Sequence, residues 1–118
     1  MSYDIHLEDE KGERVLLDEP LGIRGGTYCI GGTREAWLNV TYNYSKFFYE
    51  HIDPDLGIRF LYGKKAADCI PILEKAIAAL GTDRDSDYWK ATAGNAGAAL
   101  ADLLTLAKAS PNSIFNGD

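Results

Sequence analysis

The sequence predicts an α+β protein, a small antiparallel β-sheet with two main helices packed on one face. Three observations lead to this prediction. Alternation of apolar and polar residues, which is typical of half-buried strands, is found mainly in the first 43 residues. Helical periodicity fills two long segments of the second half, at 66–80 and 92–109. Strands that precede helices, instead of alternating with them, favour the α+β class.

The first strands are expected near the N-terminus. Tyr3, Ile5 and Leu7 alternate with polar residues, a turn-like stretch follows at 9–12, and residues 13–19 (ERVLLDE) form the second arm of a predicted β-hairpin. A short β-prone run, TYCI at 27–30, lies between two Gly-Gly turns. Residues 35–43 alternate again, which predicts a core face of Ala36, Leu38, Val40 and Tyr42 and an opposite face of Trp37, Asn39, Thr41 and Asn43.

The helices are expected to follow. Asn43 or Ser45 is the predicted cap of a short helix at 46–51, and residues 58–62 predict a short strand or an extended lead into the helix at 66–80. The predicted core positions of that helix are Ile70, Leu73, Ile77 and Leu80, and those of the helix at 92–109 are Ala96, Ala99, Leu100, Leu103, Leu104 and Ala107. Gly94 and Gly97 open this second helix; glycine is costly in a helix, which predicts close approach of another backbone.

The size and charge of the chain limit the classes of function. With 118 residues, 46% of them hydrophobic, the chain has room for one domain, residues 1–118, with one core. Eighteen acidic and twelve basic residues give a net charge of −6. Binding to phosphate backbones needs clustered Lys and Arg, so we expect no direct DNA or RNA binding. The acidic surplus serves solubility, and a face that mimics nucleic acid is the alternative.

The N-terminal segment and the cysteines indicate a compartment. The first ten residues hold four acidic residues and no apolar stretch of signal-peptide length, and no later segment approaches the roughly 20 apolar residues of a membrane span. We therefore expect a cytoplasmic protein without membrane contact. Cys29 and Cys69 belong to no CxxC pair, and we expect both to be reduced and buried.

A glycine-rich region is the first candidate site. Two Gly-Gly-Thr triplets begin six residues apart, at Gly25 and Gly31. Backbone N–H groups in such turns can hold an anion, although neither triplet fits the P-loop pattern. Two interpretations stay open: turns that end strands, or a loop that binds a ligand. The candidate residues are Arg24, Gly25, Gly26, Thr27, Gly32, Thr33 and Arg34.

The polar face predicted for residues 37–43 is the second candidate site. Asparagines and an indole on one strand face can contact the edges of a planar ligand, or they can anchor a partner protein. A solvated sheet face with a half-buried Trp is the structural alternative. The candidates are Trp37, Asn39, Asn43 and Tyr44, and Arg59 adds a donor for phosphate oxygens.

Other polar groups give weaker signals. Asp83, Asp85 and Asp87 alternate along the chain, but the Gly and the distal Glu of a calcium loop are missing, so an acidic linker is expected. His6 and His51 have no partner at metal-binding or catalytic spacing and are expected to be surface or capping residues. We therefore expect no metal and no cofactor.

Several motifs together resemble a known group of proteins. They are RGGTY, GGTREAWLNVTYNYSKFF, GIRFLYGK, DYWKATAGNAGAALADLLTLAK and FNGD, and they cover nearly the whole chain. This set resembles small, mostly uncharacterised proteins of tailed phages and prophages. Two places depart from that pattern: Lys65 follows YGK where the group often has Thr, and Gly97-Ala98 stands where it has charged residues. The resemblance implies a phage-encoded protein that acts inside the bacterial cell.

The resemblance and the composition together lead to a functional hypothesis. Small acidic accessory proteins of phages are often inhibitors of host defence. We expect a non-enzymatic protein that blocks a host defence protein complex or sequesters a signalling nucleotide; a homo-oligomer is compatible with either form. The alternatives are a virion or structural accessory protein and a small nucleotide-processing enzyme, for which the unlinked candidates are Glu35, His51, Tyr62 and Asp68.

Overall fold

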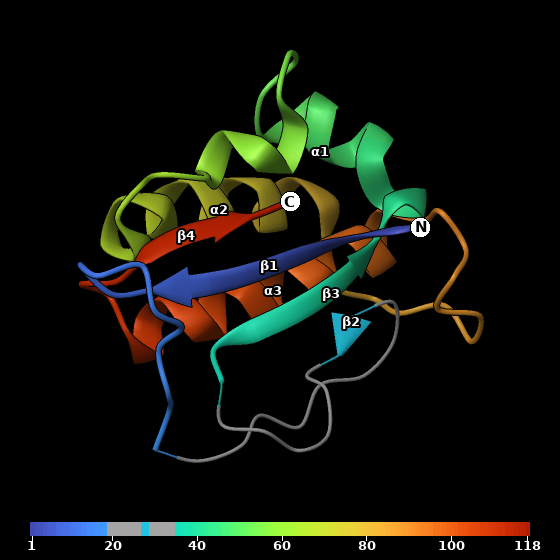
Figure 1. Ribbon diagram of the computed structural model, residues 1–118. Helices are drawn as coiled ribbons and strands as arrows, with labels where there is room; N and C mark the ends of the chain where they lie inside the picture. Colours follow the sequence, from blue (N-terminus) through green and yellow to red (C-terminus); the bar gives the residue numbers. More distant parts are fainter. Residues whose placement is uncertain (19–26, 29–34) are drawn as a thin grey trace.

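The computed structural model describes residues 1–18, 27–28 and 35–118, and within these ranges it confirms the α+β class. Four described strands form one sheet in the order β2-β3-β1-β4, with every neighbouring pair antiparallel. They are β1 (Ser2–Glu8), β2 (Thr27–Tyr28), β3 (Trp37–Thr41) and β4 (Ile114–Gly117). The helices are α1 (Ser45–His51), α2 (Ala66–Leu80) and α3 (Ala93–Ala109), with 3₁₀ helices η2 (Tyr42–Tyr44) and η3 (Gly57–Leu61). Helices α2 and α3 pack together behind the sheet (Figure 1).

Strand β1 is the centre of the sheet and of the core. Its odd-numbered residues Tyr3, Ile5 and Leu7 are buried, and Ile5 stands opposite Leu38 of β3 while Leu7 stands opposite Phe115 of β4. Successive side chains of a strand point to opposite faces, so these residues form the face that meets the helices. The predicted sheet core is thus confirmed, and Phe115 extends it.

The predicted N-terminal hairpin forms only close to its turn, where the Asp9 N–H donates to the Glu13 carbonyl and the Val15 N–H to the Leu7 carbonyl. The chain does turn at residues 9–12, where Gly12 has a φ of 80°. The returning segment then forms only isolated bridges, from Arg14 to Glu8 and from Leu16 to Glu35. The reason is competition for one edge, because β3 already pairs with residues 2–6 of β1. Of the predicted run 27–30, β2 covers residues 27–28, and residues 29 and 30 lie outside the described ranges.

The segment between β3 and α2 also differs from the prediction. Helix α1 begins at Ser45 with Tyr44 at its cap position, where no side chain makes a capping hydrogen bond, so neither Asn43 nor Ser45 caps it. The Thr41 hydroxyl instead accepts the Asn43 N–H at 3.2 Å and caps η2. Residues 57–61 form the 3₁₀ helix η3, and no strand. Its buried side chains, Ile58 and Leu61, are three residues apart, a spacing that suits a 3₁₀ turn and places both toward the core.

The two long helices begin and end close to their predicted limits, but the predicted stripe of α2 is displaced. Its buried residues are Ala66, Cys69, Leu73, Ala76 and Leu80, while Ile70 and Ile77 are only partly buried. In α3 the predicted core positions are buried except Leu104, which is partly buried, and Leu106 is an additional buried residue. Small residues thus occupy several of the buried positions of α2, and the larger isoleucines are only partly buried.

The expectation for the two glycines of α3 is confirmed. A Cβ at Gly94 would overlap the backbone carbonyl of Asp83, and a Cβ at Gly97 would overlap that of Gly81. The start of α3 therefore lies directly against the backbone that follows α2.

The structure also bears on the expectations for membranes and thiols. Among the described helices, none has the length and apolar character needed to cross a membrane. Cys69 is buried and free, and burial raises the pKa of its thiol to about 11, so the group stays protonated near neutral pH. Cys29 lies outside the described residues.

Candidate functional site

The structure distributes the predicted site residues over several places. Arg24, Gly25, Gly26, Gly32, Thr33 and Arg34 lie outside the described residues, and only the backbone of Thr27 is described. Trp37 and Asn39 lie on the sheet face opposite the helices. Asn43 and Tyr44 lie beneath the loop that joins α2 to α3, and Arg59 lies in a hollow beside α1.

Trp37 is not the exposed anchor that the alternating pattern suggested. Only 8% of its surface is accessible, and the Arg14 guanidinium lies 5.5 Å from its ring centroid. Arg14 is held there by an ion pair with Glu35 at 3.5 Å. The indole Nε1 is buried and has no hydrogen-bond partner among the described residues. The strand period places Trp37 on the outer face correctly, where Arg14 of the returning N-terminal segment lies over its ring.

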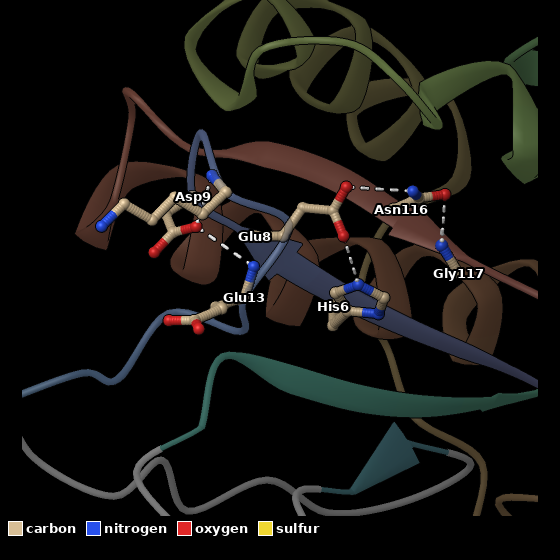
Figure 2. A network of polar contacts seen from close by, with 7 residues as sticks. His6, Glu8, Asp9, Glu13, Asn116 and Gly117 are labelled. Carbon is tan, nitrogen blue, oxygen red and sulfur yellow. Dashed lines mark hydrogen bonds and ion pairs between the residues drawn. The ribbon is translucent and has the colours of Figure 1, made fainter.

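The outer face of the sheet carries a polar network that joins its strands (Figure 2). His6 Nε2 and Glu8 Oε2 are 3.0 Å apart, and Asn116 Nδ2 donates to Glu8 Oε1 at 3.1 Å. The hydrogen bonds from His6 and then from Asn116 lower the pKa of Glu8. Nearby, Asn39 Nδ2 donates to Ser2 Oγ and Asp4 Oδ1 at 2.6 and 2.8 Å. These contacts connect the polar side chains of neighbouring strands.

This network was not predicted from the sequence, because partners of His6 were considered only at metal-binding or catalytic spacing and not at the two-residue spacing of a strand. His6 and Glu8 are two residues apart, which places both side chains on one face, and Asn116 comes from the far end of the chain. A histidine oriented by a carboxylate is part of many catalytic sites, but a nucleophile must lie within hydrogen-bond reach. Among the described residues, Glu8 is the only side chain in hydrogen-bond contact with His6. The arrangement by itself therefore defines no reaction.

Apart from the His6–Glu8 pair, the described residues form no cluster that suits metal binding, and the acidic and basic candidates for catalysis lie apart. Within the described ranges, no group of three or more His, Cys, Asp or Glu is placed to hold a metal ion. The four residues considered for an enzyme belong to separate elements, being placed before β3, at the end of α1, after η3 and within α2. They are Glu35, His51, Tyr62 and Asp68.

Among the residues whose side chains the structure describes, the most exposed aromatic ones lie in the loop between α2 and α3. We call residues 81–92 the aromatic loop. Tyr88 and Trp89 are 42% and 48% exposed, and their ring centroids are 5.0 Å apart. The body of the protein holds both residues through their backbone. Asn43 Nδ2 donates to the carbonyl of Trp89 at 2.7 Å, and the Tyr44 hydroxyl donates to the carbonyl of Tyr88.

Asn95 fixes the same loop from the start of α3. Its side chain is buried, with 3% of the residue exposed. Oδ1 accepts the Asp85 N–H at 2.9 Å, and Nδ2 donates to the carbonyls of Asp87 and Lys90 at 3.1 and 2.9 Å. The amide thus bonds three backbone groups at the beginning, middle and end of a six-residue stretch.

The acidic residues of the aromatic loop have a local structural role. Asp85 Oδ1 accepts the Asp87 N–H at 2.9 Å, and Asp87 Oδ1 accepts the Trp89 N–H at 3.1 Å. Such bonds between a side chain and the backbone two residues on are characteristic of Asx turns. Arg84 forms an ion pair with Asp102 of α3 at 3.5 Å. The segment predicted as an acidic linker is therefore an ordered series of turns that ends at the two aromatic residues.

Comparisons of the chain with protein-family models, with curated proteins and with solved structures found no match.

Proposed function

We propose that the protein is a non-catalytic binding protein that holds another protein through Tyr88 and Trp89. The observation that carries the proposal is an exposed aromatic pair on a loop whose backbone is fixed from two sides. Trp and Tyr are enriched among the residues that dominate the energy of protein interfaces. Leaving two such side chains side by side in water gives up the stabilisation that their burial would supply.

The order of the aromatic loop supports binding. A flexible loop loses conformational entropy when a partner immobilises it, and this loss weakens the complex. Here Asn43, Tyr44 and Asn95 have already immobilised the backbone in the free protein. By contrast, Leu16 and Leu56 are also exposed, but neither has an exposed large apolar residue beside it in the described sequence, and single exposed apolar residues are common on protein surfaces.

The biological role that we propose rests on the resemblance to phage proteins. In this role the protein acts in the bacterial cytoplasm and antagonises an antiviral defence by occupying a surface of a defence protein. Such blocking needs only an anchor of suitable shape, and it requires no catalytic group. The aromatic loop supplies this anchor.

The proposal is tested by capture and by titration. Tagged wild-type protein, Trp89→Ala, Tyr88→Ala and the control Leu56→Ala are incubated with bacterial lysate, and bound proteins are identified by mass spectrometry. We expect a partner that the wild type and Leu56→Ala retain and that Trp89→Ala loses. In calorimetry with the purified partner, Trp89→Ala should cost at least about 2 kcal/mol, as expected for a central anchor. Undiminished binding by a variant with both aromatic residues replaced would refute the proposal.

A further inference from the structure

The two exposed rings of the aromatic loop lie among acidic residues. Asp83 and Asp87 are exposed and Asp85 is partly buried, and Asp87 directly precedes Tyr88 in the chain. We infer that the partner protein contacts this loop through arginine side chains, which stack on the aromatic pair and form ion pairs with the aspartates. The inference rests on the proposed function, because it names the chemistry of the partner that the same loop holds.

The aspartates of the aromatic loop outnumber the cations that could compensate them. Arg84 is engaged by Asp102 of α3 at 3.5 Å, and Lys90 is the other cation of the loop. No ion pair among the described residues includes one of the three aspartates of the loop. The chain as a whole carries a net charge of −6, which adds to the field of the loop. A basic partner surface is therefore the complementary one.

The turns of the loop use only part of the acceptor capacity of these carboxylates. Asp87 Oδ1 accepts the Trp89 N–H at 3.1 Å. An ionised carboxylate has two oxygens and can accept further hydrogen bonds. Among the described residues, none donates a hydrogen bond to Asp87 Oδ2. Because the bond to the Trp89 N–H fixes this carboxylate beside the backbone of Trp89, a cation bound to it lies next to the aromatic pair.

Arginine is the side chain that suits both features of the loop. Its planar guanidinium stacks on aromatic rings and forms two parallel hydrogen bonds with a carboxylate, whereas lysine offers a more strongly hydrated point charge. The protein contains such a contact elsewhere: the Arg14 guanidinium lies 5.5 Å from the ring centroid of Trp37 and forms an ion pair with Glu35 at 3.5 Å. The aromatic loop offers the aromatic and acidic parts of the same contact, and the partner supplies the arginine.

The test is an NMR titration of the isotope-labelled protein with three peptides of equal length, Gly-Arg-Gly-Arg-Gly, Gly-Lys-Gly-Lys-Gly and Gly-Glu-Gly-Glu-Gly, each with blocked ends. The signal to follow is the indole N–H of Trp89, and that of Trp37 is the internal reference because its side chain is buried. We expect a saturable shift of the Trp89 signal with the arginine peptide, weaker binding of the lysine peptide and no shift with the glutamate peptide. Added salt should weaken binding of the arginine peptide, because it screens exposed charges.

Variants that remove one charge separate the ion pair from the structure of the loop. Asp87→Asn keeps a side-chain oxygen that can accept the Trp89 N–H, so the turn is preserved. This variant should weaken binding of the arginine peptide about two- to five-fold, as expected for an exposed ion pair. Trp89→Ala should weaken it about two- to thirty-fold through loss of the cation–π contact. Lys90→Gln should bind this peptide at least as well as the wild type does.

Glu10→Gln is the matched control, because it removes a charge far from the loop. Glu10 lies in the turn after the last residue of β1, whereas the loop is anchored through Asn43, just after Thr41, which pairs with Ser2 at the first residue of that strand. The control should bind the arginine peptide like the wild type.

Three results would overturn the inference. They are an unchanged Trp89 signal with the arginine peptide at millimolar concentration, an equal or larger shift with the glutamate peptide, and undiminished binding of the arginine peptide by a variant that carries both Asp83→Asn and Asp87→Asn. The proposed function is judged separately by protein capture. A protein partner that Trp89→Ala loses, but that the double Asn variant binds at full affinity, would overturn the arginine contact and leave the protein-binding function in place.

Discussion

Replacement of Asn95 by Ala tests the claim that a buried side chain holds the aromatic loop in place. The substitution removes three hydrogen bonds, from the Asp85 N–H and to the carbonyls of Asp87 and Lys90. At about 0.5–1.5 kcal/mol each, the three bonds contribute about 1.5–4.5 kcal/mol to stability. Residues 86–90 are exposed, so water can replace part of this loss, and Ala is the better helix former by about 0.5 kcal/mol. We expect a net loss of about 2 kcal/mol.

The measurements combine urea unfolding with amide hydrogen exchange. Unfolding gives the total free-energy change, and exchange at the Asp85 amide shows whether the loss lies in the aromatic loop, because this amide donates to Asn95 in the wild type. Asn112→Ala is the control, since Asn112 is an exposed asparagine between α3 and β4 and its replacement should change stability by less than about 0.5 kcal/mol. Wild-type stability together with unchanged exchange at Asp85 would show that Asn95 does not hold the loop.

Two further predictions concern the helix contact and the sheet face. Gly97→Ala should destabilise by about 1–3 kcal/mol in urea unfolding, because the new Cβ meets the Gly81 carbonyl, a backbone group that cannot rotate away; equal or greater stability would contradict the close contact. Glu8 has a pKa below its usual 4.5, so its carboxylate stabilises the fold above that pH and this contribution is lost as the pH falls through the lowered pKa. The stability difference between wild type and Glu8→Gln should therefore shrink from about pH 5 to about pH 3, and a constant difference would exclude this role.

The helices were the most predictable part of the fold because their signals are local. Apolar periodicity located both long helices. Two core positions of α2 were predicted at Ile70 and Ile77, each one residue after the position that is buried. The reason is that hydrophobicity alone ranks isoleucine above cysteine and alanine. The buried positions are instead held by smaller side chains, Cys69 and Ala76.

The sheet and the candidate site depend on contacts between distant segments. The sequence-based predictions were wrong or incomplete at the residues whose position those contacts determine. Strand β4 has four residues, two of them Asn116 and Gly117, so nothing local marks it as a strand. Trp37 was assigned to the correct face, but its burial and its contact with Arg14 involve a distant segment that the local pattern does not indicate. Asn43 and Tyr44 were predicted to contact a ligand or partner, but their polar groups instead hold the backbone of Tyr88 and Trp89. These hydrogen bonds join residues more than 40 positions apart, so a local pattern does not indicate them.

The pairing of β1 with β4 has a consequence for synthesis on the ribosome. The central strand is made long before β4, and one of its edges stays open until residues 114–117 have been translated. Until then Leu7 lacks Phe115, and the exposed edge can pair with other nascent chains. Folding of the sheet is therefore completed only after residues 114–117 have been made, and truncated chains that lack these residues would aggregate or be degraded.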